Sequence, residues 1–278
     1  MIRNMQKTNN DMTTGMDKGN ILDRIVARKR QEIESDKRRL PTVRLEESDN
    51  FFRECYSFRD SILNPALTGV IAEFKRKSPS KGIINDKASV REVTNGYVAA
   101  GASALSVLTD KNFFGGRKGD LIEARKRNQI PVLRKEFMLD EYQVVESKAL
   151  GADIILLIAA ILKPGEIQNF ARLAKSLGMS VLLEVHNREE LDRSLFPELD
   201  AVGVNNRNLA NFDVSLQHSY DLVQHIPVEF LKISESGLSN PKTISELRSA
   251  GFDGFLVGEN FMKQPDPGKA MREFVSGF

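Results

Sequence analysis

The stretch VIAEFKRKSPSKG, at residues 70–82, begins like a buried β-strand and ends in charged residues. Its first three residues are apolar, and Glu73 and Lys75 follow with opposite charges. Because strand side chains alternate between two faces, Glu73 and Lys75 share the face of Ile71. The polar, turn-forming residues that come next end the strand. This pattern is typical of the floor of a binding site, or of a solvated edge with a surface ion pair, and the stretch alone favours neither.

Similar aliphatic runs recur along the chain and alternate with amphipathic helical patterns. The predicted strands begin near Val70, Ala104, Pro131, Asp153, Ser180, Ala201, Leu231 and Gly254. The predicted helices lie at residues 87–100, 121–127, 141–150, 165–177, 188–195, 215–225, 241–250 and 266–275. This alternation predicts an α/β fold with a parallel sheet, and eight such units predict a (β/α)8 TIM barrel. A doubly wound sheet is the alternative, although no Gly-x-Gly-x-x-Gly follows the first strand.

Two helices are predicted before the first strand, at residues 21–40 and at about residues 49–63. We therefore expect residues 21–66 to form an N-terminal helical extension and residues 67–278 to form the catalytic barrel. Residues 1–20 are polar and lack the apolar core of a signal peptide. They are expected to be a flexible tail, with a transit-type role as the alternative.

The composition favours a cytoplasmic protein that acts on a small molecule. A net charge of +2 gives no reason to expect nucleic acid or a membrane surface as partner, and local lysines can still bind an anionic substrate. The longest apolar run, residues 154–162, is far shorter than the ~20 residues that cross a bilayer. The single cysteine, Cys55, excludes an intrachain disulfide and fits a reducing compartment. We expect it to be structural rather than a nucleophile.

Polar side chains stand at the ends of several predicted strands, where barrel enzymes carry their chemistry. These residues are Glu73, Lys75, Lys135, Glu184, Asn205 and Ser236. Charges that face a barrel interior are costly unless they are paired or used, so a structural ion pair is the alternative for any one of them. Their convergence favours an active site. The three histidines show no metal-ligand spacing, so acid–base work falls to lysine and glutamate, and no metal is expected.

Glycines at the last two strand ends indicate a phosphate site. Gly237 follows Ser236, and Gly258 precedes Glu259. Backbone N–H groups can approach an anion closely at glycine, and the loops after the seventh and eighth strands of such barrels often bind phosphate. Ordinary turn glycines are the alternative.

Together these motifs resemble the indole-3-glycerol-phosphate synthase family, from residue 21 to the C-terminus. Residues 71–82 resemble the family signature I-A-E-x-K-x-x-S-P-S-x-G, and residues 105–109, 131–137, 183–186, 205–209 and 234–237 also match. There are two small departures. Glu136 stands where the family usually has Asp, and Arg117 follows two glycines where a small residue is common.

The resemblance implies a lyase of tryptophan biosynthesis that needs no cofactor. Its substrate is 1-(2-carboxyphenylamino)-1-deoxyribulose 5-phosphate, which it converts to indole-3-glycerol phosphate, CO2 and water. Lys135 is implied as the acid at the carbonyl oxygen, and Glu184 as the carboxylate that takes a proton and helps expel the hydroxyl. Lys75 is implied either as the partner of the substrate carboxylate or as the acid of dehydration. Glu73 and Asn205 are implied to position the hydroxyls and the catalytic groups.

The resemblance also implies the residues that bind the substrate. For the phosphate end they are Ser78, Arg207, Ser236, Gly237, Gly258 and the amide of Glu259, and for the apolar wall around the ring they are Phe113, Phe114 and Leu133. A monomer or a weak homodimer is expected.

Three rival functions remain at this point. A phosphoribosylanthranilate isomerase would use a Cys/Asp pair at strand ends, and no cysteine lies there. A Schiff-base aldolase would use Lys135 or Lys75 as its nucleophile. A non-catalytic phosphate-binding barrel would bind a ligand without converting it.

Overall fold

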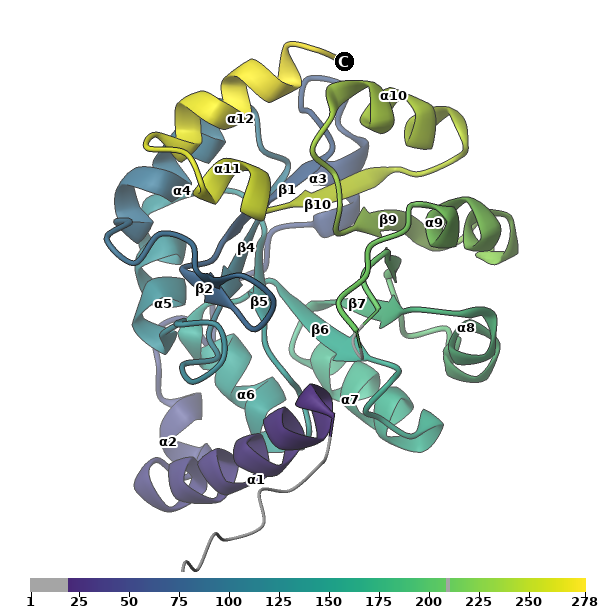
Figure 1. Ribbon diagram of the computed structural model, residues 1–278. Helices are drawn as coiled ribbons and strands as arrows, with labels where there is room; N and C mark the ends of the chain where they lie inside the picture. The colour runs from purple at the N-terminus through teal and green to yellow at the C-terminus, as the bar shows by residue number, and fades with distance from the viewer. Residues whose placement is uncertain (1–19, 209–210) are drawn as a thin grey trace, which may run out of the picture.

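The computed structural model describes residues 20–208 and 211–278, and its centre is a closed barrel of parallel strands surrounded by helices (Figure 1). The barrel strands are β1 Val70–Phe74, β4 Ala104–Leu108, β5 Val132–Lys135, β6 Ile154–Ile158, β7 Ser180–Val185, β8 Ala201–Asn205, β9 Leu231–Glu235 and β10 Gly254–Val257. They follow one another around the barrel in chain order, and β10 pairs with β1 to close it. The predicted (β/α)8 barrel is confirmed, and the doubly wound sheet is wrong.

The helices that follow the strands lie close to their predicted positions. They are α4 Val90–Ala99, α5 Lys118–Arg127, α6 Glu141–Leu150, α7 Pro164–Ser176, α8 Arg188–Ser194, α9 Gln217–Leu222 with the 3-10 turn Val223–His225, α10 Pro241–Ser249 and α12 Pro267–Val275. The sequence did not predict the hairpin of β2 Lys77–Ser78 and β3 Gly82–Ile83, or the short helix α11 Glu259–Met262. These elements are too short for a period to show. Among the described helices, none has the length and apolar character that crossing a bilayer requires.

The segment before the barrel differs from its prediction. Helix α1 Ile21–Arg39 begins at a capping box that Asn20 forms with Asp23. Of the helix predicted at about residues 49–63, only the last part forms, as α3 Phe58–Leu63, and the short helix α2 Thr42–Glu46 precedes it. The backbone N–H of Tyr56 donates to Asp153 at the foot of β6, 2.9 Å away, which holds this part of the chain extended. The predicted tail, apart from Asn20, lies outside the described residues.

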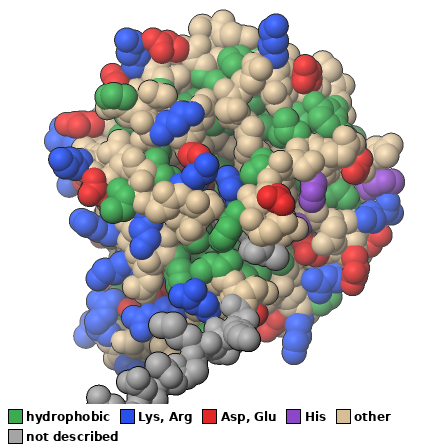
Figure 2. All heavy atoms as spheres, in the orientation of Figure 1, with side chains coloured by type: hydrophobic (Ala, Val, Ile, Leu, Met, Phe, Trp, Pro, Cys, Tyr) green, Lys and Arg blue, Asp and Glu red, His purple; other side chains and the backbone are tan. Residues whose placement is uncertain are grey.

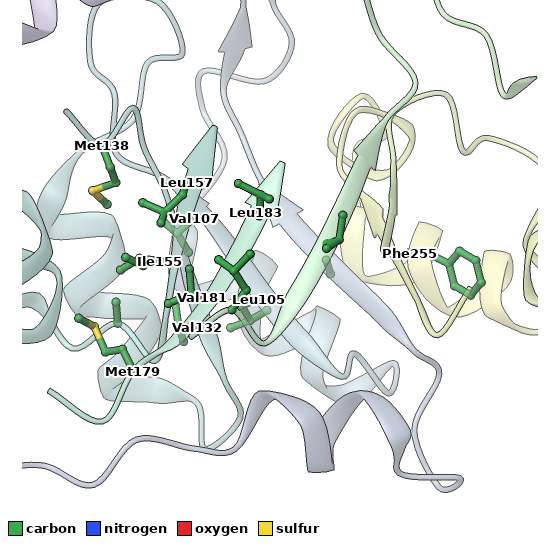
Figure 3. Close-up of a cluster of buried hydrophobic side chains, with 14 of the residues drawn as sticks. Leu105, Val107, Val132, Met138, Ile155, Leu157, Met179, Val181, Leu183 and Phe255 are labelled. Carbon is green, nitrogen blue, oxygen red and sulfur yellow. The ribbon is translucent and has the colours of Figure 1, made fainter. Parts of the chain in front are cut away.

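The inside of the barrel is built in layers to which alternate strands contribute. One layer is apolar and comes from β1, β5, β7 and β9: Ile71, Leu133, Leu182 and Ile233. Two residues further along the same strands stand four charged side chains: Glu73, Lys135, Glu184 and Glu235. We call these four the charged layer. On each strand, the side chains between the inward ones point outward. Val107, Ile155 and Leu183 are examples that pack among the helices (Figure 3).

Candidate active site

The charged layer is held together by short ion pairs. The Lys135 ammonium lies 2.9 Å from Glu184 Oε2 and 2.6 Å from Glu235 Oε2. Glu73 Oε1 pairs with the Lys75 ammonium at 2.6 Å, one step beyond the layer. From β8, Asn205 donates to Glu184 Oε1 at 3.0 Å. The five predicted catalytic residues therefore line one site, and Glu235 joins them.

A cavity of about 520 Å³ opens above the charged layer, which is large enough for a substrate of modest size. Its walls come from the loops after β1, β4, β5, β8, β9 and β10, and from the first turns of α1. Figure 2 shows this face of the molecule, with basic and acidic side chains and apolar surface gathered near its centre. Within the described residues, no group of three histidine, cysteine, aspartate or glutamate side chains suits a metal ion.

Burial and the neighbouring charges together set the pKa values of the charged layer. Burial disfavours the Lys135 ammonium, but Glu184 and Glu235 outweigh it, so the pKa of Lys135 lies well above its usual range. For Glu184, burial is outweighed by Lys135 and the Asn205 amide, and the pKa is lowered. Burial raises the pKa of Glu235 to about 7. The attraction of Lys135 opposes this rise, and the repulsion from Glu184 adds to it. One ammonium thus holds two carboxylates, and Glu235 is the one that takes up a proton more readily.

Glu235 lines the same cavity, although the sequence did not predict it. On β9, Glu235 shares the inward face of Leu231 and Ile233, because side chains two residues apart on a strand lie on the same face. Glu235 therefore points into the barrel, as Glu184 does on β7. The sequence predicts Ser236 as the polar end of this strand instead. Space for the Glu235 carboxylate comes from Gly203 on β8, where an added Cβ would lie 2.2 Å from Glu235 Oε1.

The loop after β9 has an unusual backbone. Ser236 and Gly237 both have left-handed φ angles, of 70° and 77°, which glycine adopts readily and serine rarely. The Ser236 hydroxyl donates to Asn205 Oδ1 at 2.9 Å, and the Asn205 amide donates in turn to Glu184 of the charged layer. An added Cβ at Gly237 would lie 2.5 Å from Val214 Cγ1, so the loop is also closely packed.

The other residues predicted to bind phosphate also line the cavity. They are Ser78, Arg207, Gly258 and Glu259. An added Cβ at Gly258 would lie 2.7 Å from Glu73 Oε1, so this backbone approaches the charged layer closely. The Glu259 carboxylate lies 3.6 Å from the Arg207 guanidinium and 3.8 Å from the Lys81 ammonium.

The apolar wall differs from its prediction. Phe114 lines the cavity as predicted, but its ring partner is Phe137, with the ring centroids 5.9 Å apart. Phe113 and Leu133 do not line the cavity. Leu133 is fully buried one layer below Lys135, and the loop after β4 turns Phe114 rather than Phe113 to the cavity. The apolar residues Ile21, Leu22 and Ile25 of α1, which the sequence did not predict, complete the lining.

Comparison with known proteins agrees with this geometry. A family model described as indole-3-glycerol phosphate synthase matches residues 22–274. The indole-3-glycerol phosphate synthase of Bacteroides thetaiotaomicron is 44% identical over 255 residues, which are 92% of this chain and 97% of that protein. The one from Verminephrobacter eiseniae is 45% identical over 259 residues, covering 90% and 97%.

Solved structures share the barrel at much lower identity. The 3-hexulose-6-phosphate synthase of Salmonella typhimurium has a TM-score of 0.60 at 14% identity, over 75% of this chain and 97% of that chain. The thiamine phosphate pyrophosphorylase of Pyrococcus furiosus has a TM-score of 0.55 at 17% identity, over 79% and 98%. These two show the fold alone. From the family model and the relatives of more than 40% identity, the chain belongs to the indole-3-glycerol phosphate synthase family.

Proposed function

We propose that this chain converts 1-(2-carboxyphenylamino)-1-deoxyribulose 5-phosphate to indole-3-glycerol phosphate, CO2 and water, a lyase step of tryptophan biosynthesis. The observation that carries the proposal is the Lys135 ammonium, held between two buried carboxylates at the floor of the cavity. An aromatic wall and the backbone of the β9 loop also line this cavity. A substrate with an aromatic ring at one end and a phosphate at the other matches this arrangement. We also propose a cytoplasmic location, which the free thiol of Cys55 supports.

The first chemical step is the closure of the new ring. The aromatic carbon that bears the carboxylate attacks the ribulose carbonyl carbon, and the carbonyl oxygen takes up a proton. Lys135 supplies this proton in our assignment, because its ammonium stays charged and lies in the charged layer at the centre of the floor. Loss of CO2 then returns the electron pair of the broken bond to the ring and restores its aromaticity.

The last step removes the hydroxyl group as water. In our assignment Glu184 takes a proton as the hydroxyl leaves, and the Asn205 amide keeps the Glu184 carboxylate in place. Glu235 returns a proton to Lys135, because it contacts that ammonium at 2.6 Å and its pKa lies near neutrality. Lys75 either pairs with the substrate carboxylate or protonates the departing hydroxyl.

A direct assay tests the proposed reaction. Purified protein is mixed with the carboxyphenylamino-ribulose phosphate without added cofactor, and indole fluorescence is followed. We expect indole-3-glycerol phosphate and one equivalent of CO2. A covalent adduct trapped by borohydride would favour a Schiff-base aldolase instead, and binding without indole formation would favour a non-catalytic barrel.

Replacing Gly237 with alanine should raise KM by about tenfold and change kcat much less. The new Cβ would meet Val214 Cγ1 at 2.5 Å and push the β9 loop out of its anion-binding shape. Gly178→Ala is the matched control, since Gly178 has the same φ of 77° but nothing within 4 Å of its added Cβ. Steady-state kinetics of both variants measure the effect. Equal KM values for the two variants would place the phosphate elsewhere.

Replacing Glu235 with glutamine should stabilise the protein at alkaline pH. The folded-state pKa of Glu235, about 7, is above the unfolded value, so its stabilising effect is complete at acid pH and lost as pH rises through 7. Glutamine does not ionise, so at pH 8 the variant gains on the order of 2 kcal/mol over the wild type, and below about pH 4 it gains nothing from this source.

Thermal unfolding at pH 4 and pH 8 measures this effect, and Glu229→Gln, on an exposed side chain, is the control. We expect the Tm of Glu235→Gln to exceed that of the wild type by several degrees at pH 8 only. A Tm difference that is the same at both pH values would show that Glu235 does not hold a raised pKa.

A further inference from the structure

Lys29 is a buried lysine of α1 to which the proposed chemistry gives no role. Only 4% of its surface is exposed, and it lies on the same helix face as Ile25 and Ile33. Its ammonium lies 2.8 Å from Glu32 Oε2, 2.9 Å from Asp110 Oδ2 and 3.0 Å from Glu136 Oε1. Three carboxylates from three segments of the chain therefore meet at one cation.

Asp110 shapes the loop that carries one aromatic residue of the cavity. Its Oδ1 accepts the backbone N–H groups of Phe113 at 2.7 Å and Phe114 at 3.2 Å. Its Oδ2 is buried, makes no hydrogen bond within the described residues, and faces the Lys29 ammonium. Asp110 thus positions Phe114 through one oxygen, and the Lys29 ammonium neutralises the charge at the other.

Glu136 shapes the segment that carries the second aromatic residue of the cavity, Phe137. Its Oε1 accepts the backbone N–H of Phe137 at 2.9 Å, and its Oε2 accepts the Thr109 hydroxyl at 2.7 Å. Glu136 also follows Lys135 directly in the chain, so its position affects the backbone that carries the proposed acid. The same oxygen that orders Phe137 contacts the Lys29 ammonium.

Helix α1, which carries Lys29, also lines the cavity. Ile25, one turn before Lys29, lines the cavity together with Ile21 and Leu22. In Figure 1, α1 lies across one side of the barrel beside α6. Lys29 therefore joins the helical wall of the cavity to both segments that supply its aromatic wall.

We propose that Lys29 is a positioning residue that builds the aromatic end of the cavity by holding Asp110 and Glu136 together. The inference rests on the proposed function, because it assigns this end to the carboxyphenyl group of the substrate. Without the ammonium, two buried carboxylates lose their counter-charge and must separate or take up protons. Either change moves the loops of Phe114 and Phe137, and the phosphate end keeps its own contacts.

Two probes separate the two ends of the cavity. The first is 1-(2-carboxyphenylamino)-1-deoxyribitol 5-phosphate, a reduced substrate analogue that carries both ring and phosphate and has no carbonyl to react. The second is glycerol 3-phosphate, which lacks the ring. Calorimetry measures both affinities for the wild type and for Lys29→Met, Lys29→Arg and Lys37→Met. Lys37 is the matched control, since it also ties α1 to the barrel, through Asp140 at 2.6 Å, and does not line the cavity.

We expect Lys29→Met to weaken binding of the analogue by about tenfold or more and to leave glycerol 3-phosphate unchanged. Lys29→Arg keeps the charge and should restore most of the affinity, and Lys37→Met should behave as the wild type. Equal weakening of both probes, or of neither, would overturn the proposal. If Lys29→Met does not fold, Glu136→Gln tests the same contact, because glutamine keeps an acceptor for Phe137 and loses the attraction to Lys29.

A failure of the proposed function looks different. A wild-type protein that binds neither the analogue nor the substrate would refute the function itself. A wild type that binds and turns over substrate, with Lys29→Met unaltered, would refute only the role of Lys29.

Discussion

Replacing Lys135 with alanine should lower kcat by about 10²- to 10⁴-fold, the scale of a lost general acid. The alanine variant has no ammonium at the carbonyl oxygen, and Glu184 and Glu235 then face each other without a counter-charge. Lys75 does not fill the place that Lys135 leaves, because its ammonium lies one step beyond the charged layer, 2.6 Å from Glu73. Since the lost interaction acts on the transition state, kcat and kcat/KM should fall together.

Single-turnover kinetics of ring closure measure this effect without interference from product release. Lys175→Ala is the control, since it removes an exposed ion pair with Asp200 on the outer surface and should leave kcat unchanged. Lys135→Arg keeps the charge in a different shape and should recover only part of the rate. A kcat of Lys135→Ala close to that of the wild type would exclude Lys135 as the acid of ring closure.

Replacing Gly203 with alanine should lower kcat by about 10²-fold, although residue 203 makes no contact with substrate in the proposed reaction. The added Cβ would lie 2.2 Å from Glu235 Oε1 and 3.3 Å from Leu182 Cδ1. Gly203 lies in the extended strand β8, so alanine suits its backbone and the whole effect comes from this clash. Glu235 must move, and the 2.6 Å contact with Lys135 is lost.

A second substitution tests the cause. Glu235→Asp in the Gly203→Ala background shortens the side chain by one methylene, which relieves the clash and should restore part of the rate. Gly119→Ala is the control, because nothing lies within 4 Å of an added Cβ on that helical residue. A Gly203→Ala variant with wild-type kcat would mean that the position of Glu235 does not matter for the reaction.

The barrel and much of the charged layer follow from local sequence. Aliphatic runs mark the strands, and the two-residue period on each strand places Glu73, Lys135 and Glu184 inside the barrel. The same rule applied to β9 selects Glu235, but Ser236 and Gly237 suggested that chemistry begins one residue later. Which residue completes a layer depends on the register between strands, such as Asn205 opposite Glu235, and a single strand does not contain this information.

Contacts between distant segments were harder to predict. Lys29 counts as a polar residue in a helical pattern, although its ammonium is buried against the loops after β4 and β5. Phe113 and Phe114 lie in a loop, where no period tells which ring turns inward. The apolar spacing of residues 49–63 fits a helix, but the chain there is held by Asp153, far along the sequence.

Residues at different levels along the barrel axis are under different selective pressures. Below the charged layer, Ile71, Leu133, Leu182 and Ile233 interlock as fully buried hydrocarbon, so mutations there act on folding. Two residues higher, the same four strands carry the groups assigned to proton transfer. A lineage descended from such a barrel can acquire a new reaction by exchanging one tier of side chains, while the tier beneath continues to specify the architecture.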